Sequence, residues 1–323
     1  MKGIFLMKFL KVLKTIFIMI IIFVTVSIGT FTILAVLTPS MPITASDIAS
    51  TLSGLIFPGS VRPQTNALIL GIDDGGLSDT IMLASFNSET GRVDLISIPR
   101  DTRIQLPAEH ITKIQQAGRF VPQSGIMKFC ELHSFAGPDL GPTLMKYKAE
   151  YILGIDIHYY VSLSLQAFRH VVDAVGGVYF DVPQRMHYIG YDILIDLHPG
   201  PQLLNGHNAE GLVRFRQYRD GDLGRVRMQQ EFLAALMREM LQLENLFATT
   251  NAILTTTARY MDTNFPIGNV GAYLRRANRI STDNLGLNTL PGTLQNINGI
   301  SFVIINTYQA RQFVTNILNE GEY

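Results

Sequence analysis

The chain has 323 residues, room for one large domain or two small ones, and its 26 Lys and Arg balance its 26 Asp and Glu. A chain without net positive charge is a poor candidate for binding nucleic acid, and we expect no nucleic-acid partner. Cys130 is the only cysteine, which excludes an intramolecular disulfide, and the seven histidines lack a zinc-motif spacing such as H-E-x-x-H.

The N-terminal segment predicts a membrane anchor. Residues 15–37 carry no charge, and a helix of this length can cross a hydrocarbon core of ~30 Å. Lysines precede this stretch, and no Lys or Arg follows it before Arg62, an asymmetry that favours a cytoplasmic N-terminus. A cleaved signal peptide is the alternative, but its apolar region would be shorter, about 7–15 residues, and no clear A-x-A cleavage site is present.

We therefore expect a single-pass membrane protein with four parts. They are a cytoplasmic N-terminus (1–14), a transmembrane helix (15–37), an extracytoplasmic linker (38–63) and an extracytoplasmic domain (64–323).

Three strands in quick succession are predicted at the start of the domain. NALILGID is an apolar run that ends at Asp73, DTIMLASFN opens at Asp79, and RVDLISIPR follows the turn residues SETG. Residues 105–149 contain several Gly and Pro, so we expect loop and short helix there.

Strands and helices alternate in the rest of the chain. YYVSLS predicts a strand, LQAFRHVVDAV a helix, and GGVYFDV a strand after a Gly-Gly turn. A longer helix follows in MQQEFLAALMREMLQLENLF, and FVIINT and ARQFVTNIL predict a final strand and helix. This alternation predicts a three-layer α/β/α sandwich with a central mixed sheet, preceded by the transmembrane helix.

Asp73 and Asp79 flank the turn between the first two predicted strands. Gly75 and Gly76 permit a tight reversal, which would bring both carboxylates to one edge of the sheet, where α/β proteins usually bind ligands. Paired carboxylates suit Mg²⁺, which completes its coordination with water and phosphate oxygens. The alternative is that both are ordinary turn residues.

Arg100 and Asp101 end the third predicted strand. Because the strands are neighbours, we expect Arg100 to reach the edge that holds Asp73 and Asp79. The alternative is an Arg–Asp pair on the surface.

The stretch VRFRQYRDGDLGRVRMQQ, residues 213–230, concentrates arginine without any lysine. Arginine alone suggests a planar anion held by paired donors. Arg214 and Arg216 share a face if the segment is extended, and Arg225 and Gln229 share a face of the following helix. The segment would then direct three arginines at one anion, such as a pyrophosphate. A solvated charged turn is the alternative.

Several blocks of the sequence, in order, resemble the LytR-CpsA-Psr family. They are LILGIDDGGLSDTIMLASFNSETGRVDLISIPRDT, KIQQAG, HYYVSLSLQAFRHVVDAVGGVYFDV, IDLHPGPQLLNGHNAEGLVRFR and GDLGRVRMQQEFL. The ordered set is highly specific, and the resemblance covers about residues 66–318. It implies a bacterial transferase that acts outside the cell membrane. Such an enzyme moves a glycopolymer from a polyprenyl-pyrophosphate carrier to peptidoglycan, forming a phosphodiester link.

The resemblance also implies roles for individual residues. Asp73 and Asp79 match magnesium ligands, and Arg100, Arg214, Arg216 and Arg225 match the arginines around the pyrophosphate. Asp101 and Asp222 match acidic positions near the site and are the candidates for the base that takes the proton of the sugar hydroxyl. Lys113 and Gln229 match substrate-binding positions.

Two positions depart from the family pattern. Leu77 and Met228 stand where members usually carry Arg, although Arg227 lies beside the second position. The missing Arg at Leu77 leaves open a regulatory or inactive module that binds the lipid pyrophosphate. A hydrolase that acts on prenyl pyrophosphates is a further alternative, because water can replace the sugar hydroxyl at the same site.

Overall fold

The structure, a computed structural model, describes the domain but not the N-terminal segments. The described residues are 61–242, 250, 253, 257, 260–277, 279–280 and 284–319. The predicted cytoplasmic segment, the transmembrane helix and most of the linker lie outside them. Within the described residues, no helix is both long enough and apolar enough to cross a membrane.

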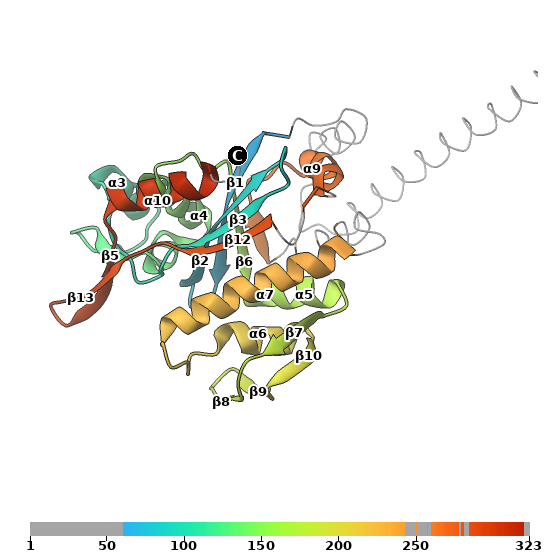
Figure 1. Cartoon of the computed structure of the whole chain (residues 1–323). Coiled ribbons are helices and arrows are strands. Elements are labelled where there is room, and N and C mark those ends of the chain that lie inside the picture. Colours follow the sequence, from blue (N-terminus) through green and yellow to red (C-terminus); the bar gives the residue numbers. More distant parts are fainter. Residues whose placement is uncertain are drawn as a thin grey trace, which may run out of the picture. The chain divides into compact units, whose positions relative to one another are not determined.

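A six-stranded mixed sheet forms the centre of the domain (Figure 1). In order across the sheet, the strands are β11 (Met261–Thr263), β6 (Tyr159–Ser164), β1 (Gln64–Ile72), β2 (Ser78–Asn87), β3 (Val93–Ser97) and β12 (Leu285–Thr289). β2 pairs antiparallel with both β1 and β3, whereas β6 runs parallel to β1, and β12 parallel to β3. This confirms the predicted mixed α/β fold and the three consecutive strands.

Helices cover both faces of the sheet (Figure 1). On one face, Leu68 and Leu83 of the sheet belong to the same core as Met145 of α4 (Glu131–Leu153). The helices α3 (Ala108–Gln116) and α10 (Thr307–Asn319) contribute to this core as well. On the other face, Met82 and Leu95 pack against Leu233 of α7 (Asp222–Gln242). All five residues of β3 are buried, as expected for a strand covered on both sides.

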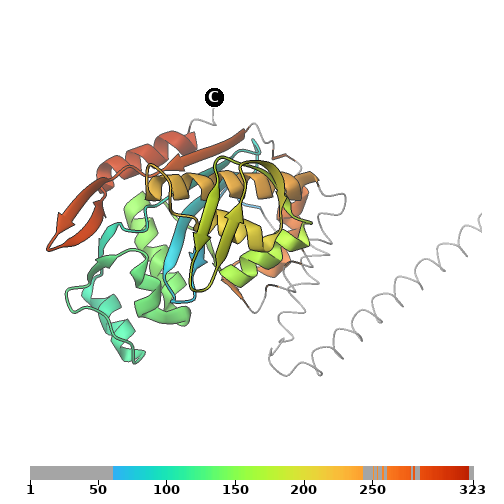
Figure 2. The ribbon, with the colours of Figure 1, turned by 90° about the horizontal axis from the view of Figure 1, so that it is seen from below.

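A second hydrophobic core lies beside the sheet. It is built by α5 (Leu165–Ala174), β7 (Val178–Val182), β8 (Met186–Ile189), β9 (Leu194–Leu197), β10 (Gly200–Leu204), α6 (Gly206–Arg214) and α7. β7 pairs with β10, and β8 with β9, both antiparallel (Figures 1 and 2). The predicted turn before β7 is present, with φ of 89° at Gly176 and 94° at Gly177, values that a residue with a Cβ rarely adopts.

The remaining elements are short. They are β4 (Arg103–Gln105), β5 (Ile126–Lys128), η1 (Ile267–Asn269), α9 (Val270–Ala277), β13 (Thr293–Ile297) and β14 (Ile300–Ile304). β13 and β14 form an antiparallel hairpin that projects from the domain (Figure 2).

The prediction of loop and short helix for residues 105–149 was wrong for its second half. The 23-residue helix α4 runs through Pro138 and Pro142. Gly137 has a non-helical φ of 77° and divides the helix at a kink, so Pro138 begins a new helical segment. Proline is tolerated in a first helical turn, where its missing N–H has no partner to lose.

Candidate functional site

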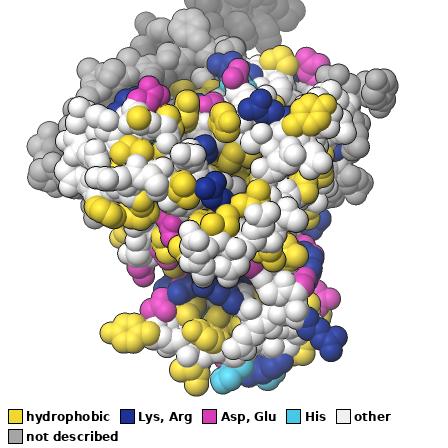
Figure 3. Space-filling view, turned by 90° about the vertical axis from the view of Figure 1, so that its left-hand side faces the viewer, with side chains coloured by type: hydrophobic (Ala, Val, Ile, Leu, Met, Phe, Trp, Pro, Cys, Tyr) yellow, Lys and Arg dark blue, Asp and Glu magenta, His cyan; other side chains and the backbone are white. Residues whose placement is uncertain are grey.

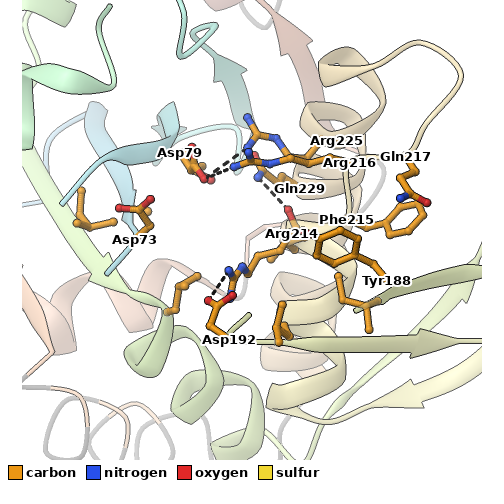
Figure 4. A pocket seen from close by; sticks show the side chains of 17 residues that line it. Asp73, Asp79, Tyr188, Asp192, Arg214, Phe215, Arg216, Gln217, Arg225 and Gln229 are labelled. Atoms are coloured by element: carbon orange, nitrogen blue, oxygen red, sulfur yellow. Dashed lines mark hydrogen bonds and ion pairs between the residues drawn. The ribbon is translucent and has the colours of Figure 1, made fainter. Parts of the chain in front are cut away.

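A pocket of about 260 Å³ opens where β1 and β2 are joined, beside α6 and α7 (Figure 4). Its lining includes Asp73 and Asp79 from the β1–β2 turn and Arg214, Arg216 and Arg225 from the arginine-rich stretch. The structure thus brings together two segments that are more than a hundred positions apart in the sequence.

The β1–β2 turn fixes Asp73 through its own backbone. Oδ1 of Asp73 accepts a hydrogen bond of 2.7 Å from the amide of Leu77, and the amide of Asp73 donates to the Leu77 carbonyl at 2.9 Å. The turn is tied to α4 through His133, whose Nδ1 lies 2.9 Å from the Gly76 carbonyl oxygen. Burial lowers the pKa of His133. The neutral ring can therefore donate from Nδ1 to that carbonyl.

Asp79 lies at the centre of an arginine cluster. Its Oδ1 accepts a hydrogen bond from Arg100, and its Oδ2 accepts one of 2.7 Å from Arg216. Nη1 of Arg225 lies 3.6 Å from the same Oδ2. Burial alone would raise the pKa of Asp79, but the three guanidinium groups outweigh it and lower the pKa. Asp79 is therefore ionised at neutral pH.

Arg225 is the most buried charged residue of the pocket lining. Its side chain is 1% exposed, and Nη2 lies 2.9 Å from Asp222. Among the described residues, its Nε has no hydrogen-bond partner. Burial, together with the neighbouring Arg100, lowers the pKa of Arg225. Burial also opposes the charge on Arg100, but Asp79 and Asp222 raise its pKa. The three guanidiniums thus converge on Asp79, and the other carboxylates within 4 Å of them, among the described residues, are Asp222 and Asp101.

Arg214 has different partners. It donates to the fully buried Glu210 at 2.8 Å and to Asp192 at 2.6 Å (Figure 4). Arg169 of α5 also pairs with Glu210. Sequence reasoning missed both acids. The four-residue spacing between Glu210 and Arg214 could have indicated the first, whereas nothing in the sequence links Asp192, in the β8–β9 turn, to Arg214.

The prediction that Arg214 and Arg216 lie in one extended segment was wrong. Arg214 is the last residue of α6, and the chain becomes extended only at Phe215, with φ −62° and ψ 134°. Phe215 is buried in the second core. Because Phe215 is held in this core, the chain turns after α6. Arg214 and Arg216 therefore line the same pocket from the end of a helix and from the segment after it, rather than from one strand.

Other residues singled out in the sequence lie around the pocket or away from it. Gln229 lines it and donates to the Val213 carbonyl at 3.1 Å. Asp101 does not line it, and pairs with Lys128 at 3.2 Å. Lys113 is exposed on α3, because that helix packs through His110 and Ile114.

The two departures from the family pattern also lie outside the pocket lining. Leu77 closes the β1–β2 turn through its backbone, and Met228 is buried in the second core. Arg227 does not replace a pocket arginine, because it pairs with Asp220 at 2.7 Å and lies half-exposed.

A second, apolar pocket of about 110 Å³ adjoins the first. Ile69 and Leu163 of the sheet line it on one side, and Phe168, Phe232 and Leu233 of the helices on the other. The two pockets share Gly71, Thr80, Leu165, Val213 and Gln229. A ligand with a charged head and an apolar tail could occupy both.

The donor set suits a magnesium ion that arrives with a phosphate-bearing ligand. Within the described part of the chain, no cluster of three His, Cys, Asp or Glu side chains offers a complete protein-made site. Asp73 and Asp79 provide two carboxylates, which is what Mg²⁺ usually takes from a protein when phosphate oxygens and water complete its shell. Oδ1 of Asp73 is used by the turn, and Asp79 is held by the arginines.

One face of the domain is hollowed and carries basic side chains in the hollow (Figure 3). Acidic side chains lie beside them, and hydrophobic side chains surround both. The lining of the arginine-lined pocket contains the same three kinds of side chain.

A model of the LytR_cpsA_psr family matches residues 43–319. The chain belongs to the LytR_cpsA_psr family. Among similar proteins of known name is the polyisoprenyl-teichoic acid–peptidoglycan teichoic acid transferase TagU of Oceanobacillus iheyensis, 28% identical over 250 residues, which are 76% of this chain and 72% of that protein. The TagU protein of Enterococcus faecalis is 29% identical over 207 residues, 61% of this chain and 60% of its own length. The regulatory protein MsrR of Staphylococcus aureus is 27% identical over 218 residues, 65% of this chain and 60% of its own.

Several solved structures share the fold. The protein gbs0355 of Streptococcus agalactiae superimposes with a TM-score of 0.66 at 23% identity, over 80% of this chain and 88% of its own. TagV of B. subtilis gives 0.65 at 22% identity, over 80% and 99%. TagT bound to LIIa-WTA gives 0.62 at 22% identity, over 82% and 94%.

Proposed function

We propose that the protein is a transferase that moves a glycopolymer from a polyprenyl-pyrophosphate carrier to a sugar hydroxyl of peptidoglycan, forming a phosphodiester link. The observation that carries this proposal is the junction of an arginine-lined pocket with an apolar one. A prenyl pyrophosphate has the matching form, with an anionic head and a hydrocarbon tail. Family membership and the names of relatives such as TagU support the same reaction.

The arginine cluster would supply the electrostatic part of catalysis. Attack of the sugar hydroxyl on the phosphorus that carries the polymer breaks the bond to polyprenyl phosphate, negative charge grows on that leaving group, and the hydroxyl proton passes to solvent. Arg216 and Arg225 line the pocket, and together with Arg100, which contacts Asp79 from outside the lining, they would move to the phosphate oxygens and stabilise this charge. Phosphoryl transfer depends mainly on such positioning and neutralisation.

We further propose magnesium as the cofactor, held by Asp73 and Asp79. When bound, the ion would neutralise charge on the phosphate oxygens. The turn that fixes Asp73 and the arginine cluster that holds Asp79 would keep both carboxylates at the pocket before an ion binds.

The acidic residues beside the cluster would position arginines. Asp222 contacts Arg225 at 2.9 Å and Arg100 at 3.9 Å, and Asp101 lies 3.9 Å from Arg100. Neither acid lines the pocket, so each acts through the guanidinium that it holds.

The apolar pocket would take the start of the prenyl chain. Each CH₂ group buried there contributes about 0.8 kcal/mol. We also propose that residues 15–37 anchor the protein in the bacterial cell membrane, with the catalytic domain outside. An anchored enzyme would stay close to its lipid substrate.

One assay separates this function from its alternatives. A labelled polyprenyl-pyrophosphate glycan is incubated with the full chain and magnesium, with and without peptidoglycan. A transferase yields labelled peptidoglycan only when the acceptor is present. A hydrolase releases labelled glycan without any acceptor, and a regulatory module retains the lipid unchanged.

A further inference from the structure

A third pocket, lined in part by β4, is built like a binding site but belongs to no part of the proposed reaction. Its volume is about 600 Å³, and it shares no lining residue with the arginine-lined pocket. β4, the start of α3, the last third of α4 and the start of α10 line it. The residues are Thr102, Arg103, Ile104, Gln105, Leu106, Pro107, Ala108, Tyr147, Lys148, Tyr151, Ile152, Ile305 and Thr307.

Lys148 is a buried cation in the wall of this pocket. It is 9% exposed, and its Nζ donates to the Gln105 carbonyl at 2.8 Å. Among the described residues, no carboxylate lies within 4 Å of Nζ, although the neighbouring Lys146 pairs with Glu150 at 2.7 Å. An ammonium has three donors, and this hydrogen bond uses one of them. A buried charge with no counter-ion is rare unless a ligand supplies one.

Arg103 adds a second cation to the same wall. It lines the pocket, and its Nε is buried without a hydrogen-bond partner in the described part of the chain. The pocket also borders the start of α3, where Pro107 provides no side-chain cap for the first amides. Glu109 follows in that first turn, but it does not line the pocket. The charged groups in the lining itself are therefore all positive.

Two aromatic rings flank these cations. Tyr147 and Tyr151 lie one helical turn apart on α4, and they are 44% and 54% exposed. Nζ of Lys148 lies 4.6 Å from the centre of the Tyr151 ring, and Tyr147 packs edge-on against His110. These contacts hold both rings at the pocket while leaving part of each accessible. Arg311 also lies over the Tyr151 ring, with its Cζ 5.6 Å from the ring centre, and the parts of both rings that stay exposed suit the apolar face of a sugar.

We infer that this pocket binds an anionic saccharide, with the sugar against Tyr147 and Tyr151 and its acidic group on Lys148 and Arg103. The acidic group can be a phosphate, as on a phosphorylated glycan, or a carboxylate, as on muramic acid. The site does not depend on the proposed transferase reaction, because the two pockets are separate.

The test is a titration of the full chain in detergent, followed by calorimetry. The probes are N-acetylglucosamine 1-phosphate, N-acetylmuramic acid and neutral N-acetylglucosamine. All proteins carry Arg216→Ala, which weakens anion binding at the arginine-lined pocket. We expect saturable binding of at least one charged sugar, and affinity at least about 10-fold lower in Lys148→Met, as for the loss of one charge-assisted hydrogen bond. The tighter of the two charged probes identifies the acidic group.

Lys146→Met is the matched control, because it removes a lysine on the same helix that already has a carboxylate partner. It should bind like the parent. Arg103→Gln, at a half-buried position, should also weaken binding, and it tests the site if Lys148→Met does not fold. Two results would overturn the inference: no charged sugar binds the parent, or both pocket variants bind it as well as Lys146→Met does. Equal affinity for the neutral sugar would also contradict it.

Discussion

Arg216 donates a hydrogen bond of 2.7 Å to Asp79, although the two residues are 137 positions apart in the sequence. This contact joins the β1–β2 turn to the segment between α6 and α7. Asp79 thus keeps Arg216 at the pocket. In the proposed reaction, a substrate phosphate would take the place of Asp79 as the partner of Arg216. The first prediction concerns this pair.

Replacement of Arg216 by lysine should be nearly as damaging as replacement by alanine. Lysine keeps the charge but loses the two-pronged donor geometry of a guanidinium. The loss of one charge-assisted bond, about 1.5–3 kcal/mol, should slow transfer roughly 10- to 100-fold. Arg219→Lys is the control, because Arg219 is exposed and does not line the pocket. If Arg216→Lys transfers labelled glycan at the wild-type rate, the arginine is only a surface charge.

Asp79→Ala and Asp73→Ala should both abolish magnesium-dependent transfer, but they should differ in stability. Loss of Asp79 leaves the buried Arg225 and its neighbour Arg100 with Asp222 as their remaining shared acid, which should cost about 1–3 kcal/mol of unfolding free energy. Loss of Asp73 removes one bond to the Leu77 amide and should cost about 1 kcal/mol. Urea unfolding measures both changes. Asp74→Ala, at an exposed position of the same turn, should change neither quantity.

The contribution of Asp79 to stability should disappear in acid. Its pKa in the folded state is lowered from 3.8, so its ionised form is stabilised by folding. This stabilisation is complete above about pH 4 and is lost as the pH falls through the folded-state pKa. Asp79→Asn should therefore be less stable than wild type at pH 6, with the difference shrinking towards pH 2–3. A difference that stays constant across this range would show that the charge of Asp79 is not responsible.

A larger side chain at Ile69 should block the apolar pocket. Ile69→Phe places a ring in a space of about 110 Å³ that we assign to the prenyl chain. Displacing two CH₂ groups costs about 1.6 kcal/mol, so affinity for a long-chain carrier should fall roughly 10-fold. A water-soluble analogue with a short chain serves as the control and should react as with wild type. Equal losses with both substrates would point to a distorted sheet instead.

The membrane orientation can be tested in intact cells. If residues 15–37 span the membrane with the N-terminus inside, a tag at the C-terminus should be digested by external protease. A tag digested only after lysis would exclude this orientation.

Local patterns predicted the part of the site that lies on the sheet. Asp73, Asp79 and Arg100 lie at the ends of three consecutive strands. Strands that follow one another in the sequence also lie side by side in the sheet. The ion pair between Arg100 and Asp79 follows from that adjacency. Apolar runs and turn residues were sufficient to locate β1, β2 and β3.

Contacts between distant segments could not be predicted in this way. The pairing of Asp192 with Arg214 depends on how the β8–β9 turn folds back over α6, and no local pattern encodes it. The helix α6 was missed because its residues around Gly206 and Gly211 favour turns in isolation. The second core stabilises it once Ala209 and Leu212 are buried. Lys148 likewise became notable only through its burial without an acid.

The two hydrophobic cores have a consequence for how a long lipid could enter. Asp73, Asp79 and Arg100 are carried by the sheet, whereas Arg214 and Arg216 are carried by the part built around the second core. The pockets lie along the seam between them, which is crossed by packed side chains, by ion pairs such as Asp79 with Arg216, and by the hydrogen bond from Gln230 of α7 to Ser97 of β3. No strand of the six-stranded sheet pairs with a strand of the second core among the described residues, so a small separation of the two parts would break no strand pairing. A phosphate that takes Arg216 away from Asp79 would remove one of the ion pairs that join the two parts.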